Sequence, residues 1–187
     1  MRIIGGNLRG KKILLSFDKS TRPLRDMVRE SIFNILKHSK KESVNLNKSI
    51  VLDLFSGTGS FGIECLSRGA EKVFFFENYA KSLQILNKNI INLNLTKKTK
   101  IFQENVYEID KINLNNASFD LIFLDPPFKD KNINGILNKI KITKLINKNT
   151  IIIIHRNKKT KEIISNNLKI LREEHYGTSK IIFGKLT

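Results

Sequence analysis

A glycine-rich segment at residues 57–62 has the residue types of a nucleotide-binding turn. It has the form G-x-G-x-x-G, follows the apolar run 50–55, and precedes Glu77 by twenty positions counted from Gly57. Glycines in such a strand-to-helix turn let a ligand approach the backbone, and an acidic residue at this distance accepts hydrogen bonds from ribose hydroxyls. The spacing therefore predicts a cofactor that contains a nucleoside.

Asp53, just before this turn, helps to choose between cofactors. Its carboxylate would repel the pyrophosphate of a dinucleotide but attract the ammonium and sulfonium of S-adenosylmethionine, which carries no phosphate. Glu77 serves either cofactor, since both contain ribose. We therefore expect S-adenosylmethionine, although the glycines could instead serve only to close a tight turn.

A second candidate site is Asp125-Pro126-Pro127-Phe128, which follows the apolar run 119–124. Open α/β sheets bind their ligands at the ends of such strands. The prolines remove two N–H donors and stiffen the loop, so that Asp125 and the Pro126 carbonyl can act as fixed acceptors for an amine. Phe128 could stack on the base that carries this amine. The loop is the predicted catalytic centre, unless Asp-Pro-Pro merely ends a strand.

The chain is strongly basic, with 34 Lys and Arg, 17 Asp and Glu, and a net charge of +17. Such a surplus is typical of proteins that bind nucleic acid, although a compositional bias towards Lys would also produce it. Arginine is the better indicator, and five of the eight Arg fall in the first 29 residues. This clustering predicts an RNA-docking surface formed by Arg2, Arg9, Lys11, Lys12, Arg22, Arg25 and Arg29.

The 187 residues, 40% hydrophobic and 27% charged, suffice for one α/β domain and exclude a disordered chain. The single cysteine, Cys65, cannot form an internal disulfide, which favours a reducing compartment.

No apolar run predicts a signal peptide or a membrane span. The scattered His38, His155 and His175 lack metal-ligand spacing, so we expect structural or surface histidines and no metal. We expect a cytoplasmic monomer.

The hydrophobic pattern predicts the scaffold that positions these residues. Strand-like runs alternate with helical segments, the strands at 50–55, 73–77, 100–103, 119–124 and 150–154 and the helices at 60–68, 79–93, 133–142 and 161–167. This alternation predicts a parallel sheet with helices on both faces. Residues 168–174 and 180–183 are too close for a crossover helix, so they predict an antiparallel hairpin at one sheet edge.

A polar junction near residues 40–48 separates this scaffold from a basic amino-terminal part. Residues 2–4 and 12–15 predict a small hairpin, and residues 21–23 resemble the start of a helix. In that helix Val28, Ile32 and Leu36 recur at helical spacing. We therefore expect an RNA-docking extension over residues 1–45 and a catalytic domain over residues 46–187.

Residues 51–59 and 125–128 together resemble the motifs of class I methyltransferases that act on exocyclic amines. Further matches at residues 2–10, 21–23, 28–34 and 66–70 make the chain similar to the RsmD family of bacterial enzymes. The resemblance implies a Rossmann-like α/β fold, S-adenosylmethionine as cofactor, and methylation of one guanine N2 in 16S rRNA. It also implies a target within a partly or fully assembled small ribosomal subunit.

The same resemblance implies roles for individual residues. Asp53, Gly57 and Gly59 would hold the methionyl part of the cofactor, and Glu77 its ribose. Asn105 and Val106 would meet the adenine, with Asn105 at a position where such enzymes usually carry Asp. Phe55 and Asn78 complete the predicted cofactor-binding set, and the catalytic set is Asp125, Pro126, Pro127 and Phe128.

The same sequence features are compatible with three other functions. An adenine-N6 methyltransferase of DNA or RNA would use a similar Asp-Pro-Pro-aromatic loop and differ in its product. A nicotinamide-dependent oxidoreductase would bind NAD at the glycine turn, against which Asp53 argues. A non-catalytic RNA-binding module would bind RNA in a salt-dependent way without methyl transfer.

Overall fold

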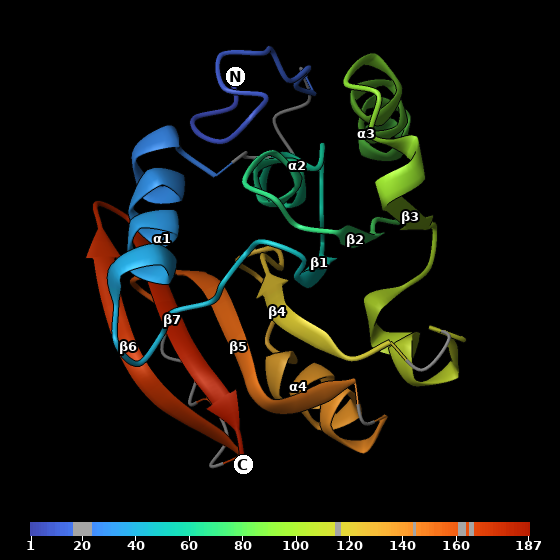
Figure 1. Cartoon of the computed structure of the whole chain (residues 1–187). Coiled ribbons are helices and arrows are strands. Elements are labelled where there is room, and N and C mark those ends of the chain that lie inside the picture. The colour runs from blue at the N-terminus through green and yellow to red at the C-terminus, as the bar shows by residue number, and fades with distance from the viewer. Residues whose placement is uncertain (17–23, 115–116, 144, 161–163, 165–166) are drawn as a thin grey trace.

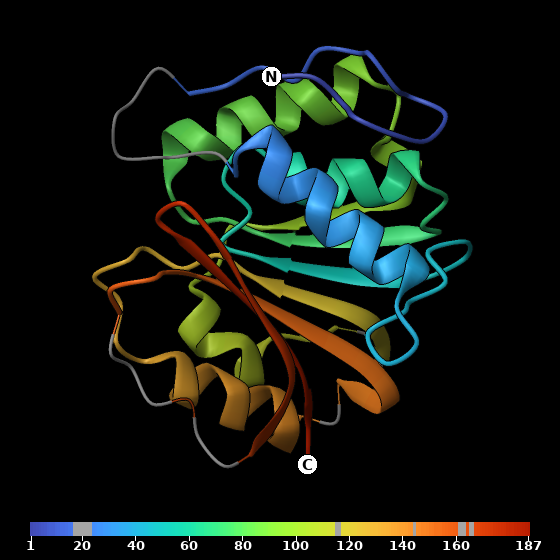
Figure 2. The ribbon, with the colours of Figure 1, turned by 90° about the vertical axis from the view of Figure 1, so that its left-hand side faces the viewer.

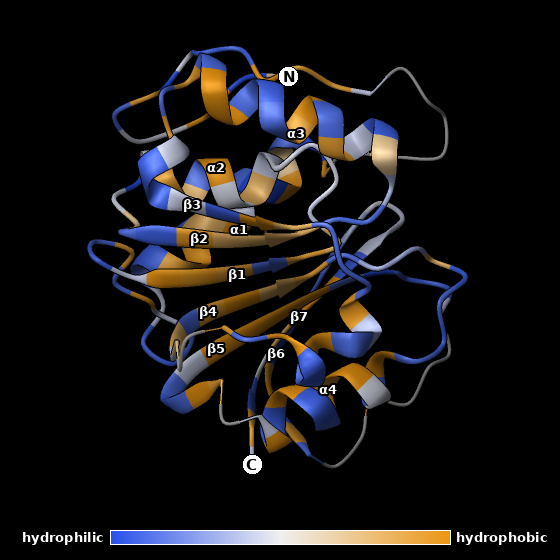
Figure 3. Ribbon diagram, turned by 90° about the vertical axis from the view of Figure 1, so that its right-hand side faces the viewer, coloured by the Kyte–Doolittle hydropathy of each residue, from blue (hydrophilic) through white to orange (hydrophobic). Residues whose placement is uncertain are grey.

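Seven strands form one mixed sheet in this computed structural model (Figure 1). In chain order they are β1 (Ile50–Leu54), β2 (Lys72–Phe76), β3 (Thr99–Phe102), β4 (Phe119–Leu124), β5 (Ile146–Asn157), β6 (Leu168–Tyr176) and β7 (Ser179–Leu186). Their spatial order is β3-β2-β1-β4-β5-β7-β6 (Figure 3). The structure describes residues 1–16, 24–114, 117–143, 145–160, 164 and 167–187.

The first five strands are parallel and β7 is antiparallel to both of its neighbours, β5 and β6. The predicted hairpin at a sheet edge is therefore confirmed, with β6 as the edge strand. β5 begins at Ile146 rather than at Thr150, because Ile146 pairs with Phe119 before a register shift. The helix expected over residues 161–167 falls largely outside the described residues.

Helices cover both faces of the sheet (Figure 2). One layer holds α1 (Asp26–His38), α2 (Ser60–Ser67) and α3 (Ala80–Asn92). The other layer holds α4 (Ile133–Ile142) and the 3-10 helix η2 (Val106–Lys111). A short 3-10 helix, η1 (Thr96–Lys98), precedes β3. Alternate strand residues enter the two cores, Val51 and Phe123 on one side and Leu52 and Ile122 on the other. Burial on both faces explains why the strands are almost continuously apolar.

The amino-terminal segment packs on α2. A single antiparallel bridge joins Arg2 to Lys12, which confirms the small hairpin in a very short form. Glu64 of α2 accepts hydrogen bonds from the backbone N–H groups of Ile4 and Gly5 at 2.9 and 2.8 Å. Apolar residues of the segment share a core with α2 and the central strands. The predicted boundary at residue 45 therefore divides the chain by expected function and not into two separate cores, since both parts contribute to one core.

α1 begins later than the sequence pattern predicts. The expected start at residues 21–23 lies outside the described residues, and the helix begins at Asp26 after an extended Arg25. A negative charge in the first turn is favourable towards the helix dipole, which supports a start at Asp26. The predicted apolar face is buried, including Val28, Ile32 and Leu36. Within the described residues, no helix is long and apolar enough to cross a membrane.

Candidate active site

The parallel strands end together along one edge of the sheet. Leu54 at the end of β1 pairs with Phe76 of β2 and with Leu124 of β4. The arrowheads of these strands point to the same side in Figure 3. The residues that follow them, Glu77 and Asp125 among others, therefore lie along this edge, so the fold brings the two predicted motifs side by side.

The glycine turn connects β1 to α2. Gly57 and Gly59 have φ angles of +56° and +83°, which glycine adopts without strain. A Cβ atom on Gly59 would lie 2.4 Å from Cδ1 of Leu86, whereas one on Gly57 would meet no described atom within 4 Å. Gly59 is therefore closely packed against Leu86, while Gly57 borders open space that a ligand can approach.

Glu77 fixes the turn from the end of β2. Its Oε2 accepts a hydrogen bond from the Gly57 N–H at 2.7 Å, and its Oε1 accepts one from the Tyr79 N–H at 2.8 Å. Burial raises the pKa of Glu77 above its ordinary value, and the amide hydrogen bonds oppose this shift. An ionised carboxylate has about four acceptor sites, so both oxygens keep capacity for ribose hydroxyls.

Asp53 does not present its carboxylate to the crevice as expected. The residue is 1% exposed, and its Oδ2 accepts a hydrogen bond from the Gly62 N–H at 3.0 Å. The first N–H groups of a helix lack intrahelical partners, which explains why a carboxylate is held there. Burial raises the pKa of Asp53 well above its ordinary value, the Gly62 bond opposes this, and the nearby Asp125 and Glu77 charges add to it. The predicted direct contact between Asp53 and the cofactor is therefore not supported by the structure. The buried Asp53 carboxyl group instead supports the turn through its hydrogen bond with Gly62.

The other predicted cofactor residues lie at the same edge. Phe55 has a φ angle of +60°, unusual for a bulky residue, and such strain is frequent at functional sites. Its ring meets that of Tyr107 edge to face at 6.3 Å. Asn105 is exposed, and its Oδ1 caps η2 by accepting from the Tyr107 N–H at 3.1 Å. Asn78 is exposed and Val106 is buried, so the polar members of this set are the accessible ones.

The Asp125 loop follows β4 at this edge. The Asp125 side chain is 21% exposed, and its backbone N–H donates to the Leu54 carbonyl at 3.3 Å. Pro126 is buried, Pro127 is exposed, and Phe128 is 37% exposed. A partly exposed carboxylate and an accessible aromatic ring therefore occur on one short loop, as a base-binding site requires.

Two consecutive residues of β5 hold this loop in place. The Nδ1 atom of His155 lies 2.7 Å from Oδ1 of Asp125. Arg156 donates hydrogen bonds to the carbonyl oxygens of Pro127, at 3.1 Å, and of Asp130. Both side chains are buried. The expectation of a structural His155 missed its contact with the predicted catalytic residue, and nothing in the local sequence marks Arg156, because β5 is far along the chain from the loop.

The predicted RNA-binding residues divide into two groups. The exposed ones are Arg2, Arg9, Lys11, Lys12 and Arg25, while Arg22 lies outside the described residues.

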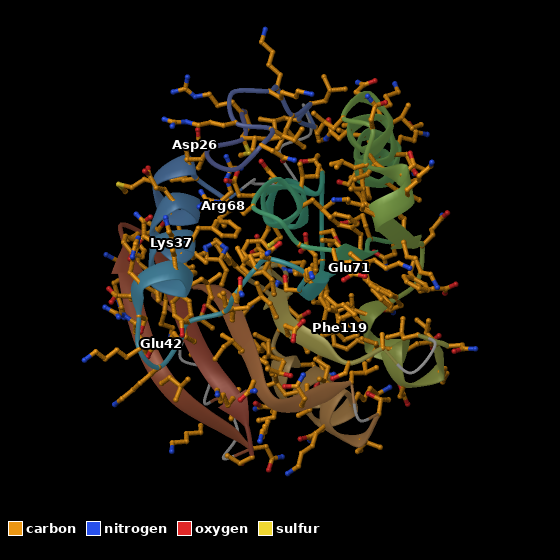
Figure 4. The ribbon with its side chains drawn as sticks, viewed as in Figure 1. Asp26, Lys37, Glu42, Arg68, Glu71 and Phe119 are labelled. Carbon is orange, nitrogen blue, oxygen red and sulfur yellow. The ribbon has the colours of Figure 1, made fainter. Side chains whose placement is uncertain are left out.

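Arg29, by contrast, is fully buried. It donates to the Arg2 carbonyl at 2.6 Å and to Asp26 at 3.1 Å, and it lies 3.7 Å from Glu64. Figure 4 shows Asp26 at the start of α1 and Arg68, a second partner of Glu64, between α1 and α2. The prediction that Arg29 contacts RNA is therefore wrong, because its guanidinium ties the amino-terminal segment to the two helices.

No group of three or more His, Cys, Asp and Glu side chains within the described ranges could hold a metal ion. Cys65 is buried, as its helical position predicts. His175 is exposed and lies 2.8 Å from Glu173. The described chemical groups at the sheet edge are therefore carboxylates, backbone groups, aromatic rings and the β5 side chains His155 and Arg156.

Sheet order, glycine turn and Asp-Pro-Pro-Phe loop together define a class I methyltransferase. A family model described as "Conserved hypothetical protein 95" matches residues 1–185. The chain therefore belongs to this family, the RsmD family of rRNA methyltransferases. The predicted family and fold are both confirmed.

Individual relatives agree over nearly the whole chain. The chain is 30% identical over 188 residues to the putative rRNA methyltransferase YlbH of Bacillus subtilis, covering 99% of this chain and 98% of the relative. It is 32% identical over 172 residues to ribosomal RNA small subunit methyltransferase D of Buchnera aphidicola from Acyrthosiphon pisum, covering 92% of this chain and 86% of the relative.

Two solved structures are similar in fold. A putative methyltransferase from Escherichia coli has a TM-score of 0.81, 25% identity and coverage of 100% and 97%. A putative methylase from Haemophilus influenzae has a TM-score of 0.77, 28% identity and coverage of 100% and 98%.

Proposed function

We propose that this methyltransferase moves a methyl group from S-adenosylmethionine to the exocyclic N2 of one guanine in 16S rRNA. The observation that carries the proposal is the register that pairs Leu54 with Leu124, since it brings the glycine turn and the Asp125 loop to one edge. Relatives named ribosomal RNA small subunit methyltransferase D support the substrate class.

The turn fits S-adenosylmethionine. The backbone at Gly57 and Gly59 would hold the methionyl part, Glu77 the ribose, and Asn105 with Val106 the adenine. Open space beside Gly57 admits the cofactor, and the Glu77 carboxylate at the end of β2 favours a cation over a pyrophosphate. When bound, S-adenosylmethionine supplies an electrophilic methyl group.

The loop fits an aromatic amine. The Pro127 carbonyl already accepts hydrogen bonds from Arg156 and from the Asp130 N–H. The Pro126 carbonyl and the Asp125 carboxylate are therefore the acceptors assigned to the hydrogens of the guanine amine, while Phe128 stacks on the base. Orientation supplies most of the catalysis. The methylated amine is acidic and loses its proton to water or transiently to Asp125.

The exposed basic residues of the amino-terminal segment form the proposed docking surface. They are Arg2, Arg9, Lys11, Lys12 and Arg25, with Arg22 nearby in sequence. Arg and Lys neutralise phosphates and so supply affinity that depends on salt. We infer a cytoplasmic monomer that acts on a partly or fully assembled small subunit.

Small ribosomal subunits that lack the modification, incubated with the protein and methyl-labelled S-adenosylmethionine, test this function. The digested RNA is expected to contain labelled N2-methylguanosine at one site. Label in N6-methyladenosine would replace guanine by adenine as the target. Salt-dependent RNA binding without label on subunits or naked RNA would contradict methyl transfer, and binding of NAD in place of S-adenosylmethionine would identify an oxidoreductase.

A further inference from the structure

We propose that His155 is a positioning residue for the methyl transfer, because it holds one oxygen of Asp125 and leaves the other for the substrate amine. The inference rests on the proposed function, which assigns the Asp125 carboxylate to that amine. His155 belongs to neither predicted motif and reaches the loop from β5.

The orientation of the His155 ring is determined at both nitrogens. Nδ1 lies 2.7 Å from Oδ1 of Asp125, and Nε2 lies 2.9 Å from the Ser179 hydroxyl on β7. A carboxylate can only accept hydrogen bonds, so Nδ1 is the donor in the first contact. The antiparallel register that pairs Asn157 with Ser179 brings this hydroxyl next to the end of β5. Two strands therefore fix one imidazole.

The two oxygens of Asp125 are in different situations. Oδ1 is engaged by His155, whereas Oδ2 has no hydrogen bond to any described residue. The Asp125 side chain is 21% exposed, while that of His155 is 7% exposed. The buried imidazole therefore holds one oxygen of a partly exposed carboxylate, and the other oxygen keeps its capacity to accept a hydrogen bond.

His155 also contacts the stacking residue of the loop. Its ring meets the Phe128 ring edge to face, with centroids 5.6 Å apart and an interplanar angle of 79°. The two groups assigned to the base, a carboxylate and an aromatic ring, thus share one neighbour. Small displacements of reacting groups reduce rates strongly, so loss of this neighbour is expected to slow the transfer.

Three substitutions separate positioning from packing. His155→Phe keeps a ring of similar shape but removes both nitrogens. His155→Asn places an amide N–H where Nδ1 was, and His155→Leu has nearly the size of Asn without a donor. His175→Phe is the matched control, because His175 is exposed on β6 and contacts Glu173 rather than the loop.

The rate of a single turnover is measured at saturating S-adenosylmethionine and RNA, together with the Kd of the cofactor and the thermal midpoint. We expect His155→Phe and His155→Leu to slow transfer by about 10- to 100-fold and to leave the cofactor Kd unchanged. His155→Asn is expected to recover most of the rate. His175→Phe should transfer at the wild-type rate. If the phenyl ring prevents folding, the Asn and Leu pair gives the same comparison.

A wild-type rate in His155→Phe or His155→Leu would overturn the inference, and so would an Asn variant as slow as the Leu variant. Asp125→Ala, measured in parallel, separates this failure from failure of the proposed function. An active Asp125→Ala contradicts the role given to Asp125 itself. An inactive Asp125→Ala beside a fully active His155→Phe overturns only the role of His155.

Discussion

The glycine turn and the Asp125 loop lie at the same edge of the sheet but are stabilised in different ways. The turn is held by Asp53 and Glu77, whose carboxylates accept hydrogen bonds from its backbone N–H groups. The loop is held by His155 and Arg156, which reach it from β5. Both regions thus use side chains of the next strand along the chain, but Glu77 lies at the spacing of a known motif whereas no motif marks His155 or Arg156.

This difference predicts a division of labour between the two regions. Changes in the turn should act first on cofactor affinity, because the open space at Gly57 is where a ligand can approach. Changes in the loop should act on the rate of transfer at saturating cofactor, because its acceptors contact the substrate amine.

Asp125→Ala carries the largest expected effect. Removal of the main acceptor for the amine should lower the transfer rate by roughly 10²- to 10⁴-fold, while cofactor binding stays close to wild type. Labelled methyl transfer and calorimetric titration of S-adenosylmethionine measure the two quantities. Loss of cofactor binding in this variant would mean that turn and loop are one unit.

Gly57→Ala and Gly59→Ala form a matched pair within the turn. Both place Ala at positive φ, which costs roughly 1–2 kcal/mol, but the new Cβ at position 59 also clashes with Leu86. Urea unfolding should therefore show the larger loss of stability for Gly59→Ala. Gly57→Ala should still fold, but it should bind S-adenosylmethionine more weakly than the wild type does. Equal stability losses would contradict the packing role of Gly59.

Asp53→Asn should change how stability depends on pH. The raised pKa of Asp53 means that the folded chain keeps a proton that the unfolded chain loses above about pH 4. Wild type should therefore lose stability relative to Asp53→Asn as pH rises, by at most about 1.4 kcal/mol per pH unit. Urea unfolding of both proteins between about pH 4 and pH 8 measures this difference. A difference that does not change with pH would show that Asp53 is ionised in the fold.

Replacement of Arg2 and Arg9 by Gln should have the smallest effect and leave the cofactor Kd unchanged. Binding of RNA should weaken, and its dependence on log salt should flatten by roughly 0.7–0.9 for each lost phosphate contact. Arg172→Gln on β6 is the control, since that arginine pairs with Glu174 and lies outside the docking segment. An unaltered salt slope in the double variant would show that Arg2 and Arg9 do not contact RNA phosphates.

The fold could be predicted because its determinants are local. Strands buried on both faces appear as apolar runs, and a short turn between the last two strands allows only an antiparallel hairpin. Glycines and acidic residues at fixed spacing likewise indicated the turn. Whether Asp53 faces a ligand or a helix terminus, however, depends on burial, which spacing does not reveal.

Residues that depend on distant partners could not be predicted. Arg29 lies among basic residues in the sequence, yet it is buried because Glu64, on another helix, faces it. In the sequence, His155 is one of three scattered histidines. In the fold, the pairing of β5 with β4 brings it to Asp125. In both cases the decisive neighbour is far away along the chain.

One experiment tests the division of labour most directly: single-turnover methyl transfer measured over a titration of S-adenosylmethionine for wild type, Gly57→Ala and Asp125→Ala. We expect Gly57→Ala to approach the wild-type rate at high cofactor concentration, whereas Asp125→Ala stays slower than wild type by roughly 10²- to 10⁴-fold at every concentration. A rate that high cofactor restores in Asp125→Ala but not in Gly57→Ala would contradict this expectation.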